Sequence, residues 1–384
     1  MAPLVALASL NVAKVFDLKT IRRLIYGEVL LAVAFVTLGF LSLFFFFDFV
    51  DEIQSLERHA DTGYRLVHAV TFVALMIPSH LYGLLPIAVL IGTIFVMARF
   101  AQSSEYTIMR TSGLGPWRAL KTLLVLGSGF VLLTFAVGDY LSPVADRNAQ
   151  LLKARYQGSI TVGQTGAWLK ERQSEAQYAV NVKALESDGS MRGVRIFEFD
   201  PQGFLMSMSE AQTASFGDDA WNLNRVNRTE FPARGLDSAR MQRAQLDSFR
   251  WPNQINSEMV AAALLKPERM STIDLFQYIQ HLKANAQTAQ RYEIEFWKKV
   301  FYPLSCLVMV VLALPFAYLH FRSGGIAIYV FGGVMAGISF FLLNNVFGYI
   351  GNLQNWQPWL TAALPGMIYS LLSLTAFGWL VLRR

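Results

Sequence analysis

The sequence predicts a membrane α-helical bundle of six transmembrane helices with an inserted all-β domain, and three observations support this prediction. Apolar residues make up 54% of the 384 residues and charged residues only 16%, too few charges for an ordinary soluble protein. A polar block rich in β-forming residues separates three long uncharged runs from three others. A hydrocarbon core about 30 Å thick needs roughly 20 helical residues, so each run is a candidate span. The runs are Val29–Phe47, Leu66–Ala98, Thr122–Gly138, Val300–Leu319, Ile326–Ile350 and Trp359–Leu382.

We expect three parts along the chain, and the positive charges orient them. Residues 1–142 hold the N-terminus and spans one to three, 143–298 the inserted domain with flanking helices, and 299–384 spans four to six. With six spans, the basic clusters gather on one side, which the positive-inside rule makes cytoplasmic. Both termini are therefore expected in the cytoplasm of a multi-pass inner-membrane protein, and the inserted domain in the periplasm. The clusters are Lys14, Lys19, Arg22 and Arg23; Arg99, Arg110, Arg118 and Lys121; His320 and Arg322; and Arg383 and Arg384.

Composition and motifs argue against other classes of protein. The net charge is +6, but no basic run is interleaved with aromatic residues as a nucleic-acid site would require. Cys306 is the only cysteine, so we expect no disulfide and no cysteine-ligated metal in the inserted domain. The motifs G-x-x-x-x-G-K-[ST], H-E-x-x-H and G-x-S-x-G are absent, and the five histidines lack metal-ligand spacing. Sequence leaves a Ser/His/Asp triad open but nominates none, and we expect neither enzyme activity nor a metal or cofactor.

Span two is longer than one perpendicular crossing requires. Pro78 and Pro86 interrupt its uncharged run. Because proline removes a backbone donor and kinks helices, we expect an interfacial helix over Leu66–Ile77 and then a kinked crossing from about Leu81. At the start of the chain, Ala2–Ala13 lacks a basic n-region and is interpreted as an extension instead of a signal peptide.

The central block predicts a short polar helix to about Tyr156 followed by seven or more antiparallel strands. Turn residues at intervals separate these runs, which favours a sandwich or jelly roll. In Arg195–Phe199 successive side chains point to alternate faces of the strand, as in a half-buried strand. This shows which residues share a face but not which face points inward. Ser271 and Asp274 have capping-box spacing and open a helix through about Lys283. The runs are Ser159–Lys170, Gln177–Ala184, Gly193–Phe199, Phe204–Ser209, Ala211–Phe216, Trp221–Thr229 and Met241–Phe249.

The loop between spans two and three predicts a short helix over residues 103–112. A serine is expected to cap it, Glu105 lies in the first turn where the helix dipole favours an anion, and Gly113 ends it. A short amphipathic helix held between two crossings suits docking into a groove on a cytoplasmic partner. The alternative is a capped surface turn without a partner.

Basic residues also flank the outer ends of spans three and four. Such a collar suits lipid phosphates, which Arg and Lys bind by charge-assisted hydrogen bonds. The alternative is that these are solvated or snorkelling side chains at the membrane interface. The residues are Arg147, Lys153 and Arg155 after span three, and Arg291, Lys298 and Lys299 before span four.

Several of these segments resemble those of the lipopolysaccharide export permeases, the LptF/LptG family, from about Leu18 to the C-terminus. The G-x-W segment and the R-Y-x-x-x-x-W segment are most similar to the G-type subunit, LptG, and the F-type subunit is the alternative. The segments are the S-E-x-x-x-[ML]-[RQ]-x-[SC]-G pattern over Ser104–Gly113, Phe49–Asp51, Gly138–Tyr140 with Pro143, Gly166–Leu169 and Arg291–Ser305.

The resemblance implies a permease subunit of an ABC-type exporter that extracts lipopolysaccharide from the inner membrane and passes it to a periplasmic bridge. Implied partners are an LptF-like permease in a heterodimer, two copies of an LptB-like ATPase that supplies ATP hydrolysis, and an LptC-like protein with a single helix. A competing hypothesis from another class is a membrane scaffold that couples an ATPase to an external partner without passing lipid.

The resemblance also assigns roles to residues. Glu105, Met109 and Arg110 are expected to contact the ATPase. Lys153 matches a position of lipid head-group contact beyond span three, and Gln150 occupies another. The headgroup set is then Arg147, Lys153, Arg155, Lys298 and Lys299.

Three further groups complete these expectations. The acidic lip of Asp48, Asp51 and Glu52 would repel phosphates unless a divalent cation or another subunit compensates it. The stripe of Phe40, Phe44 and Phe47 is expected to line an acyl-chain cavity, or equally to face lipid. The groove of the inserted domain is expected to be lined by residues near Ile196, with Trp168, Phe197, Phe199 and Trp221 as candidates.

Overall fold

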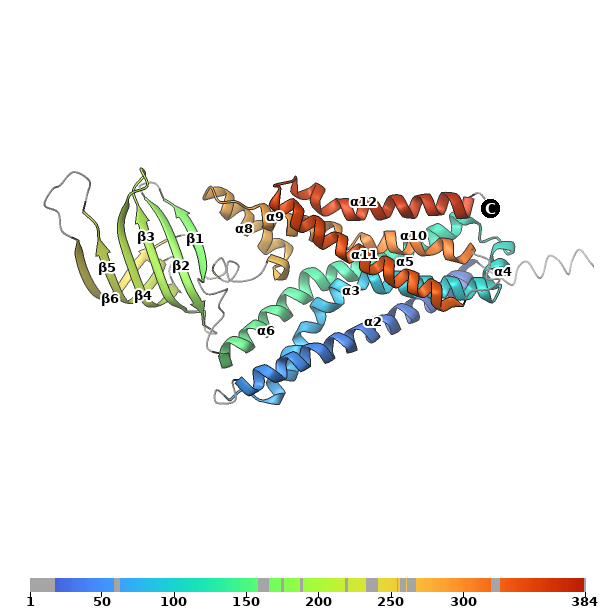
Figure 1. The fold of residues 1–384 in the computed structure, drawn as a ribbon, viewed down its shortest axis with the longest axis horizontal. Coiled ribbons are helices and arrows are strands. Elements are labelled where there is room, and N and C mark those ends of the chain that lie inside the picture. Colours follow the sequence, from blue (N-terminus) through green and yellow to red (C-terminus); the bar gives the residue numbers. More distant parts are fainter. Residues whose placement is uncertain are drawn as a thin grey trace, which may run out of the picture. The chain divides into compact units, whose positions relative to one another are not determined.

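A computed structural model describes residues 18–58, 63–157, 166–173, 176–186, 189–217, 220–232, 241–253, 255, 260, 267–318 and 325–382. The chain divides into two compact units (Figure 1). The first, here the helical unit, comprises Met1–Phe47, Ile77–Leu141 and Trp297–Arg384. The second, here the sheet unit, comprises Asp48–Met76 and Ser142–Phe296. Helices α2 (Leu18–Arg58), α3 (Leu66–Gln102) and α9 (Gln290–Phe301) each contribute residues to both.

Long apolar helices dominate the helical unit, because uncharged runs of this length satisfy their backbone only as helices in hydrocarbon. Five described helices are long and apolar enough to cross a membrane: Lys19–Glu57, Leu66–Gln102, Pro116–Lys153, Ile326–Leu353 and Pro358–Trp379. A sixth span results if Gln290–Phe301 and Ser305–Tyr318, which meet at a bend of 46°, are counted as one. The other elements are α4 (Glu105–Thr111), α5 (Pro116–Ala136), η2 (Val137–Leu141), α10 (Ser305–Ala313), η4 (Leu314–Tyr318), α11 (Ile326–Leu353), α12 (Pro358–Ala376) and η5 (Phe377–Leu382).

The prediction of two separate helices in span two was wrong. The structure has one continuous helix, α3, that contains both Pro78 and Pro86. A proline removes only one hydrogen bond of the helix, and neighbouring helices can hold the flanking turns in place. Proline therefore did not end this helix, although it would end most helices exposed to water.

Glycines set the closest helix approaches in the helical unit. A Cβ at Gly92 of α3 would lie 2.8 Å from the backbone nitrogen of Val33 in α2. Cβ atoms at Gly333 and Gly337 of α11 would each lie 2.7 Å from an isoleucine side chain of α3. Small residues at such positions let apolar helices pack by van der Waals contact. Gly333 and Gly337 thus permit the close approach of α11 to α3, whereas Gly332 has open space beside it.

In the described part of the sheet unit, six antiparallel strands form one sheet in sequence order, β1-β2-β3-β4-β5-β6. Runs 204–209 and 211–216, predicted as two strands, form the single strand β4, since no turn residue separates them and Glu210 pairs on both sides. Residues 159–165 of the first predicted run lie outside the described residues. The strands are β1 (Ala167–Arg172), β2 (Gln177–Leu185), β3 (Met191–Phe199), β4 (Leu205–Gly217), β5 (Ala220–Glu230) and β6 (Gln242–Pro252).

Helices flank the strands in sequence. The predicted helix before the sheet is α6 (Ser142–Gln157). After the last strand come η3 (Pro267–Arg269) and α8 (Thr272–Ala284). The capping box of α8 is confirmed: the Asp274 N–H donates to the Ser271 hydroxyl over 3.1 Å, and the Ser271 N–H donates to the Asp274 carboxylate over 3.2 Å. These two bonds satisfy backbone donors that the first turn of a helix leaves without partners.

An interruption, here called the crease, crosses the sheet. In each of the four strand pairs from β2 to β6, one pair of facing residues is missing from the regular antiparallel pairing. Between β2 and β3, for example, Val182 pairs with Val194 and Ala184 pairs with Arg192, but the residues between them do not pair. Gly193 and Arg225 lie in this interrupted row with left-handed φ angles of 65° and 51°. Because alternation breaks there, buried side chains in β3, β4 and β5 are three residues apart across the crease instead of two: Met191 and Val194, Ala211 and Ala214, and Leu223 and Val226.

Candidate functional sites

Helix α4 presents one face to solvent and anchors the other. Tyr106 and Met109 are buried in the core of the helical unit, where the Tyr106 ring meets the Tyr318 ring edge-on at 5.1 Å. Glu105 and Arg110 are exposed, and so is Ile108, at 54%. The Arg110 guanidinium lies 5.0 Å from the centre of the Tyr318 ring, a cation–π distance.

Two expectations for α4 need correction. Met109 is only 6% exposed, so it anchors the helix instead of offering a surface contact. Ser104 adopts a left-handed conformation and makes no side-chain cap, while the hydroxyl of Ser103 donates to the carbonyl of Arg99 at the end of α3. The predicted C-terminal signal is confirmed, because Gly113 has φ 102° and its N–H donates to the carbonyl of Arg110. Sequence reasoning missed Ile108, which its i, i+3 spacing from Glu105 could have indicated.

A buried ion pair ties distant segments of the sheet unit together. The Lys153 ammonium lies 3.0 Å from a carboxylate oxygen of Glu52, whose side chain is 6% exposed. The Tyr64 hydroxyl donates to the other carboxylate oxygen over 2.9 Å. Burial, together with this bond to a carboxylate, raises the pKa of Tyr64, so the hydroxyl remains a donor. Lys153 also lies 4.5 Å from the centre of the Phe72 ring.

Aromatic side chains enclose this pair. The His68 ring stacks on Tyr156 with centroids 4.3 Å apart, and Tyr64 lies 5.9 Å from His68. The Arg65 N–H donates to Nδ1 of His68, so a neutral ring carries its proton on Nε2, which faces the Tyr156 hydroxyl oxygen at 2.9 Å. We refer to Glu52, Tyr64, His68, Phe72, Lys153 and Tyr156 as the Glu52 cluster.

The Glu52 cluster changes the interpretation of the acidic lip. Glu52 has a cation from its own chain, so neither a divalent ion nor another subunit is needed to compensate it. Asp51 is exposed, and Asp48 is half-buried. Of the other basic residues after span three, Arg147 is exposed, and the side chain of Arg155 lies outside the described residues. Lys153 is thus already engaged within the protein, with 30% of its side chain exposed.

The two lysines before span four contact different helices. Lys299 is buried, and its ammonium donates over 3.0 Å to the carbonyl of Gly138 in the wide turn of η2. A π-helical turn leaves carbonyls without ordinary i+4 partners, which gives the ammonium an acceptor there. The Lys298 ammonium lies against Gly348 of α11, 2.6 Å from where a Cβ would sit. Lys299 therefore supports the helical packing instead of standing exposed in a collar, which corrects the expectation for this residue.

Comparison with known proteins places these features in a family. The sequence model described as "Lipopolysaccharide export system permease LptF/LptG" matches residues 23–382. The chain belongs to the LptF/LptG family. It is 27% identical over 336 residues to a protein of Escherichia coli strain K12 named "Lipopolysaccharide export system permease protein LptG", covering 86% of this chain and 90% of that protein. It is 26% identical over 371 residues to the protein of the same name from Haemophilus influenzae, covering 96% and 99% of the two chains.

The phenylalanine stripe of this LptF/LptG-family chain lies along one side of α2. Phe44 and Phe47 are exposed at 37% and 57%, and Phe40 is half-buried. Phe44 stacks on His80 of α3 with centroids 4.8 Å apart. Spacings of four and three residues keep the three rings on one helix face, where they offer an apolar surface.

The four aromatic candidates for the groove do not share one face of the sheet. Trp221 is fully buried, and its indole N–H donates to the carbonyl of Ile255. Trp168 is 53% exposed and stacks on the half-buried Phe197 with centroids 5.8 Å apart, on the face opposite the buried Ile196. Phe199 is half-buried at the irregular end of β3. The expectation of a single groove lined by all four was therefore wrong, because neighbouring strand residues point to opposite faces.

Metal ligation finds no support among the described residues. No group of three or more His, Cys, Asp or Glu side chains there is arranged to hold an ion. Cys306 is buried beside Thr134, with its sulfur 3.3 Å from the hydroxyl.

Proposed function

We propose that the chain is a G-type permease subunit that extracts lipopolysaccharide from the inner membrane and passes it to a periplasmic bridge. The observation that carries this proposal is the family match over residues 23–382, supported by relatives named LptG. In this proposal the chain has six spans and cytoplasmic termini. A separate LptB-like ATPase supplies the energy, and LptF-like and LptC-like proteins complete the assembly.

The proposed ATPase contact is the exposed face of α4. Glu105 and Arg110 supply opposite charges, and Ile108 adds an apolar side chain between them. The buried Tyr106 and Met109 hold the helix rigidly on its support. A rigid short helix with an exposed apolar residue flanked by charges suits insertion into a groove of a partner.

Charge reversal at Glu105 tests this contact. In the purified complex, Glu105→Lys is expected to lower ATPase association and lipopolysaccharide-stimulated hydrolysis about tenfold, because one charge-assisted hydrogen bond contributes about 1.5 kcal/mol. Association is measured by titrating ATPase onto the permease in nanodiscs, and hydrolysis by phosphate release.

The matched control is Glu57→Lys, which reverses another exposed carboxylate, in the sheet unit. Its association and stimulated hydrolysis should equal those of the unchanged protein. Normal association and hydrolysis in Glu105→Lys would rule out this contact. A purified complex that retains no lipopolysaccharide would favour the scaffold hypothesis.

The proposed headgroup contacts are Arg147 and Lys153, with Arg155 beside them in sequence. Arg147 is exposed, and Lys153 is partly exposed. A lipid phosphate approaching Lys153 would compete with Glu52 for the same ammonium. Because the Lys153 side chain is partly exposed, a phosphate can approach its ammonium and replace Glu52 as the partner.

The inserted domain is proposed as a jelly-roll conduit in the periplasm. Strands β1 and β6 are the outermost of the described sheet, and nearly all of β6 is exposed on both faces. Such an edge can pair with a β-domain of an LptC-like or LptF-like partner through backbone hydrogen bonds. Acyl chains would then follow the apolar face that carries Val194 and Ile196.

A photocrosslinker in β3 tests the conduit. Placed at Val194 or Ile196, it is expected to form acyl-chain adducts with lipopolysaccharide only during ATP hydrolysis, because these positions are buried at rest. Placed at Arg195 or Phe197, on the opposite face, it should form no acyl adduct. Mass spectrometry of the crosslinked peptides identifies the attached part of the lipid. Acyl adducts at all four positions, or at none, would contradict the conduit.

A further inference from the structure

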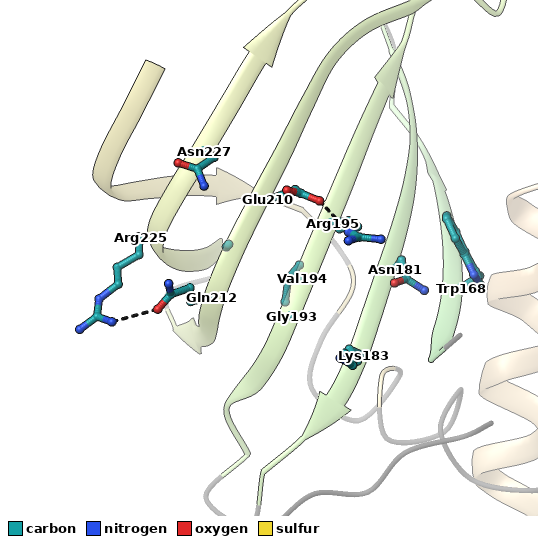
Figure 2. Close-up of a pocket in the computed structure, with 11 residues that line it drawn as sticks. Trp168, Asn181, Lys183, Gly193, Val194, Arg195, Glu210, Gln212, Arg225 and Asn227 are labelled. Atoms are coloured by element: carbon teal, nitrogen blue, oxygen red, sulfur yellow. Dashed lines mark hydrogen bonds and ion pairs between the residues drawn. The ribbon is translucent and has the colours of Figure 1, made fainter. Parts of the chain in front are cut away.

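The face of the sheet opposite the buried core, here the open face, carries a hollow of about 550 Å³. Figure 2 shows its lining side chains spread over strands β1 to β5. Volumes of this size are typical of small-molecule sites. Seven of its eleven lining residues have polar or charged side chains, which does not suit the acyl chains of a lipid. The lining includes Trp168, Asn181, Lys183, Arg195, Gln212 and Arg225.

The crease shapes this hollow. Lys183, Gly193, Gln212 and Arg225 belong to the interrupted row, and all four line the hollow. A left-handed φ is rare and unfavourable for an arginine, and it persists mainly where the surrounding structure enforces it. At Gly193 a Cβ would lie 3.0 Å from the Cβ of Lys183, so a side chain there would crowd the row. The backbone of the crease thus has an unusual conformation at residues that line the hollow.

The charge of the hollow favours an anion. Three cationic side chains and one carboxylate line it, a formal net charge of +2. The carboxylate, Glu210, is already paired with Arg195 over 2.7 Å. Arg225 donates to the side-chain oxygen of Gln212 over 2.9 Å, which leaves its positive charge uncompensated (Figure 2). Within the described part of the chain, neither Lys183 nor Arg225 pairs with a carboxylate.

The uncharged lining favours a saccharide. Trp168 supplies an exposed aromatic wall that Phe197 supports from one side by stacking. The amides of Gln212 and Asn227 carry donors and acceptors on the neighbouring strands β4 and β5. An aromatic surface beside planar amides suits a pyranose, which has apolar faces and a rim of hydroxyls. Arginine adds bidentate hydrogen bonds to a phosphate or carboxylate substituent.

We propose that this open-face hollow binds an anionic oligosaccharide, with one sugar ring against Trp168 on β1 and a phosphate or carboxylate of another ring beside Arg225 on β5. The inference rests on the proposed function, since the lipid of that proposal carries a saccharide. It assigns the sugar part of the substrate to the open face and the acyl chains to the opposite one.

The test uses the full chain in its complex in phosphatidylcholine nanodiscs. The probe is the phosphorylated oligosaccharide released from lipopolysaccharide without acyl chains, and binding is measured by isothermal titration calorimetry. We expect Trp168→Ala and Arg225→Asn each to weaken binding about tenfold. Asparagine tolerates the left-handed backbone, so Arg225→Asn removes the cation and keeps the crease. Trp168→Tyr should restore most of the affinity lost in Trp168→Ala.

Further probes and a control separate the possible ligands. Arg192→Gln alters an arginine of β3 outside the hollow and should leave binding unchanged. Dephosphorylated oligosaccharide should bind more weakly but still depend on Trp168. Equal binding by all variants, no binding, or equally tight binding of inorganic phosphate or adenosine monophosphate would overturn the inference. If the unaltered complex binds no saccharide probe but still retains lipopolysaccharide and hydrolyses ATP normally, only the hollow assignment fails and the proposed function stands.

Discussion

Replacing Gly92 by alanine is expected to lower the apparent Tm of the purified protein by about 6–12 °C, because overpacking here costs about 3 kcal/mol. The added Cβ would lie 2.8 Å from the nitrogen and 2.9 Å from the Cα of Val33. Both are backbone atoms of α2, so no side-chain rotation relieves the contact and the two helices must separate. Separation would expose the buried neighbours of this contact, including Val29 and Val33. Thermal unfolding in detergent, followed by near-ultraviolet circular dichroism, measures the change.

The control for this prediction is Gly83→Ala in the same helix. A Cβ at Gly83 meets nothing within 4 Å, so alanine should keep or slightly raise the Tm through its better helix propensity. Gly92→Leu should be worse than Gly92→Ala. Equal losses at Gly83 and Gly92 would show that general helix effects, and not the approach of α2 to α3, explain the result.

Breaking the Glu52–Lys153 pair is expected to give the second large effect. Glu52→Gln should cost about 2 kcal/mol, or roughly 4–8 °C in Tm, because it removes the charge that holds the Lys153 ammonium. The amide still accepts from Tyr64, so the loss reports mainly on the ion pair. Lys153→Met should cost at least as much, since it leaves a buried carboxylate without its cation.

A double-mutant cycle measures the coupling directly. Glu52→Gln combined with Lys153→Met should lose less than the sum of the single losses, with a coupling of about 1–2 kcal/mol. The pair Arg291–Glu268 is the control, because its side chains are 55% and 49% exposed and such pairs contribute about 0–1 kcal/mol. Additive losses at Glu52 and Lys153 would mean that the observed contact contributes nothing to stability.

The spans and the capped helix show what local sequence can predict. An uncharged run satisfies its backbone in hydrocarbon only as a helix, so the positions of α5, α11 and α12 follow from composition. The capping box of α8 and the glycine end of α4 involve residues only a few positions apart. Interactions this short in sequence depend little on the rest of the fold. Pro78 and Pro86 mark the limit of this reasoning, since packing around α3 overrode their local preference.

The roles of individual charged and aromatic residues depended on distant partners. The sequence gives no local partner for Lys153, because Glu52, which pairs with it, lies 101 positions earlier. Lys299 lies 161 positions from the carbonyl that it contacts, and Met109 is buried by helices remote in sequence. The crease likewise exists only through the pairing of five strands, β2 to β6. The alternation within Arg195–Phe199 also does not indicate which face of the sheet is covered.

The sequence by itself determined the order of the long apolar helices, the place of the inserted β-domain and the helix between the second and third of them. These depend on composition and on neighbours within a few residues. Only the tertiary structure decided that Glu52 neutralises Lys153, that Met109 faces inward and that Trp168 and Trp221 lie on opposite faces of one sheet. The physical reason is that pairing and burial depend on distances in space, which many different registers and packings of the same elements would change.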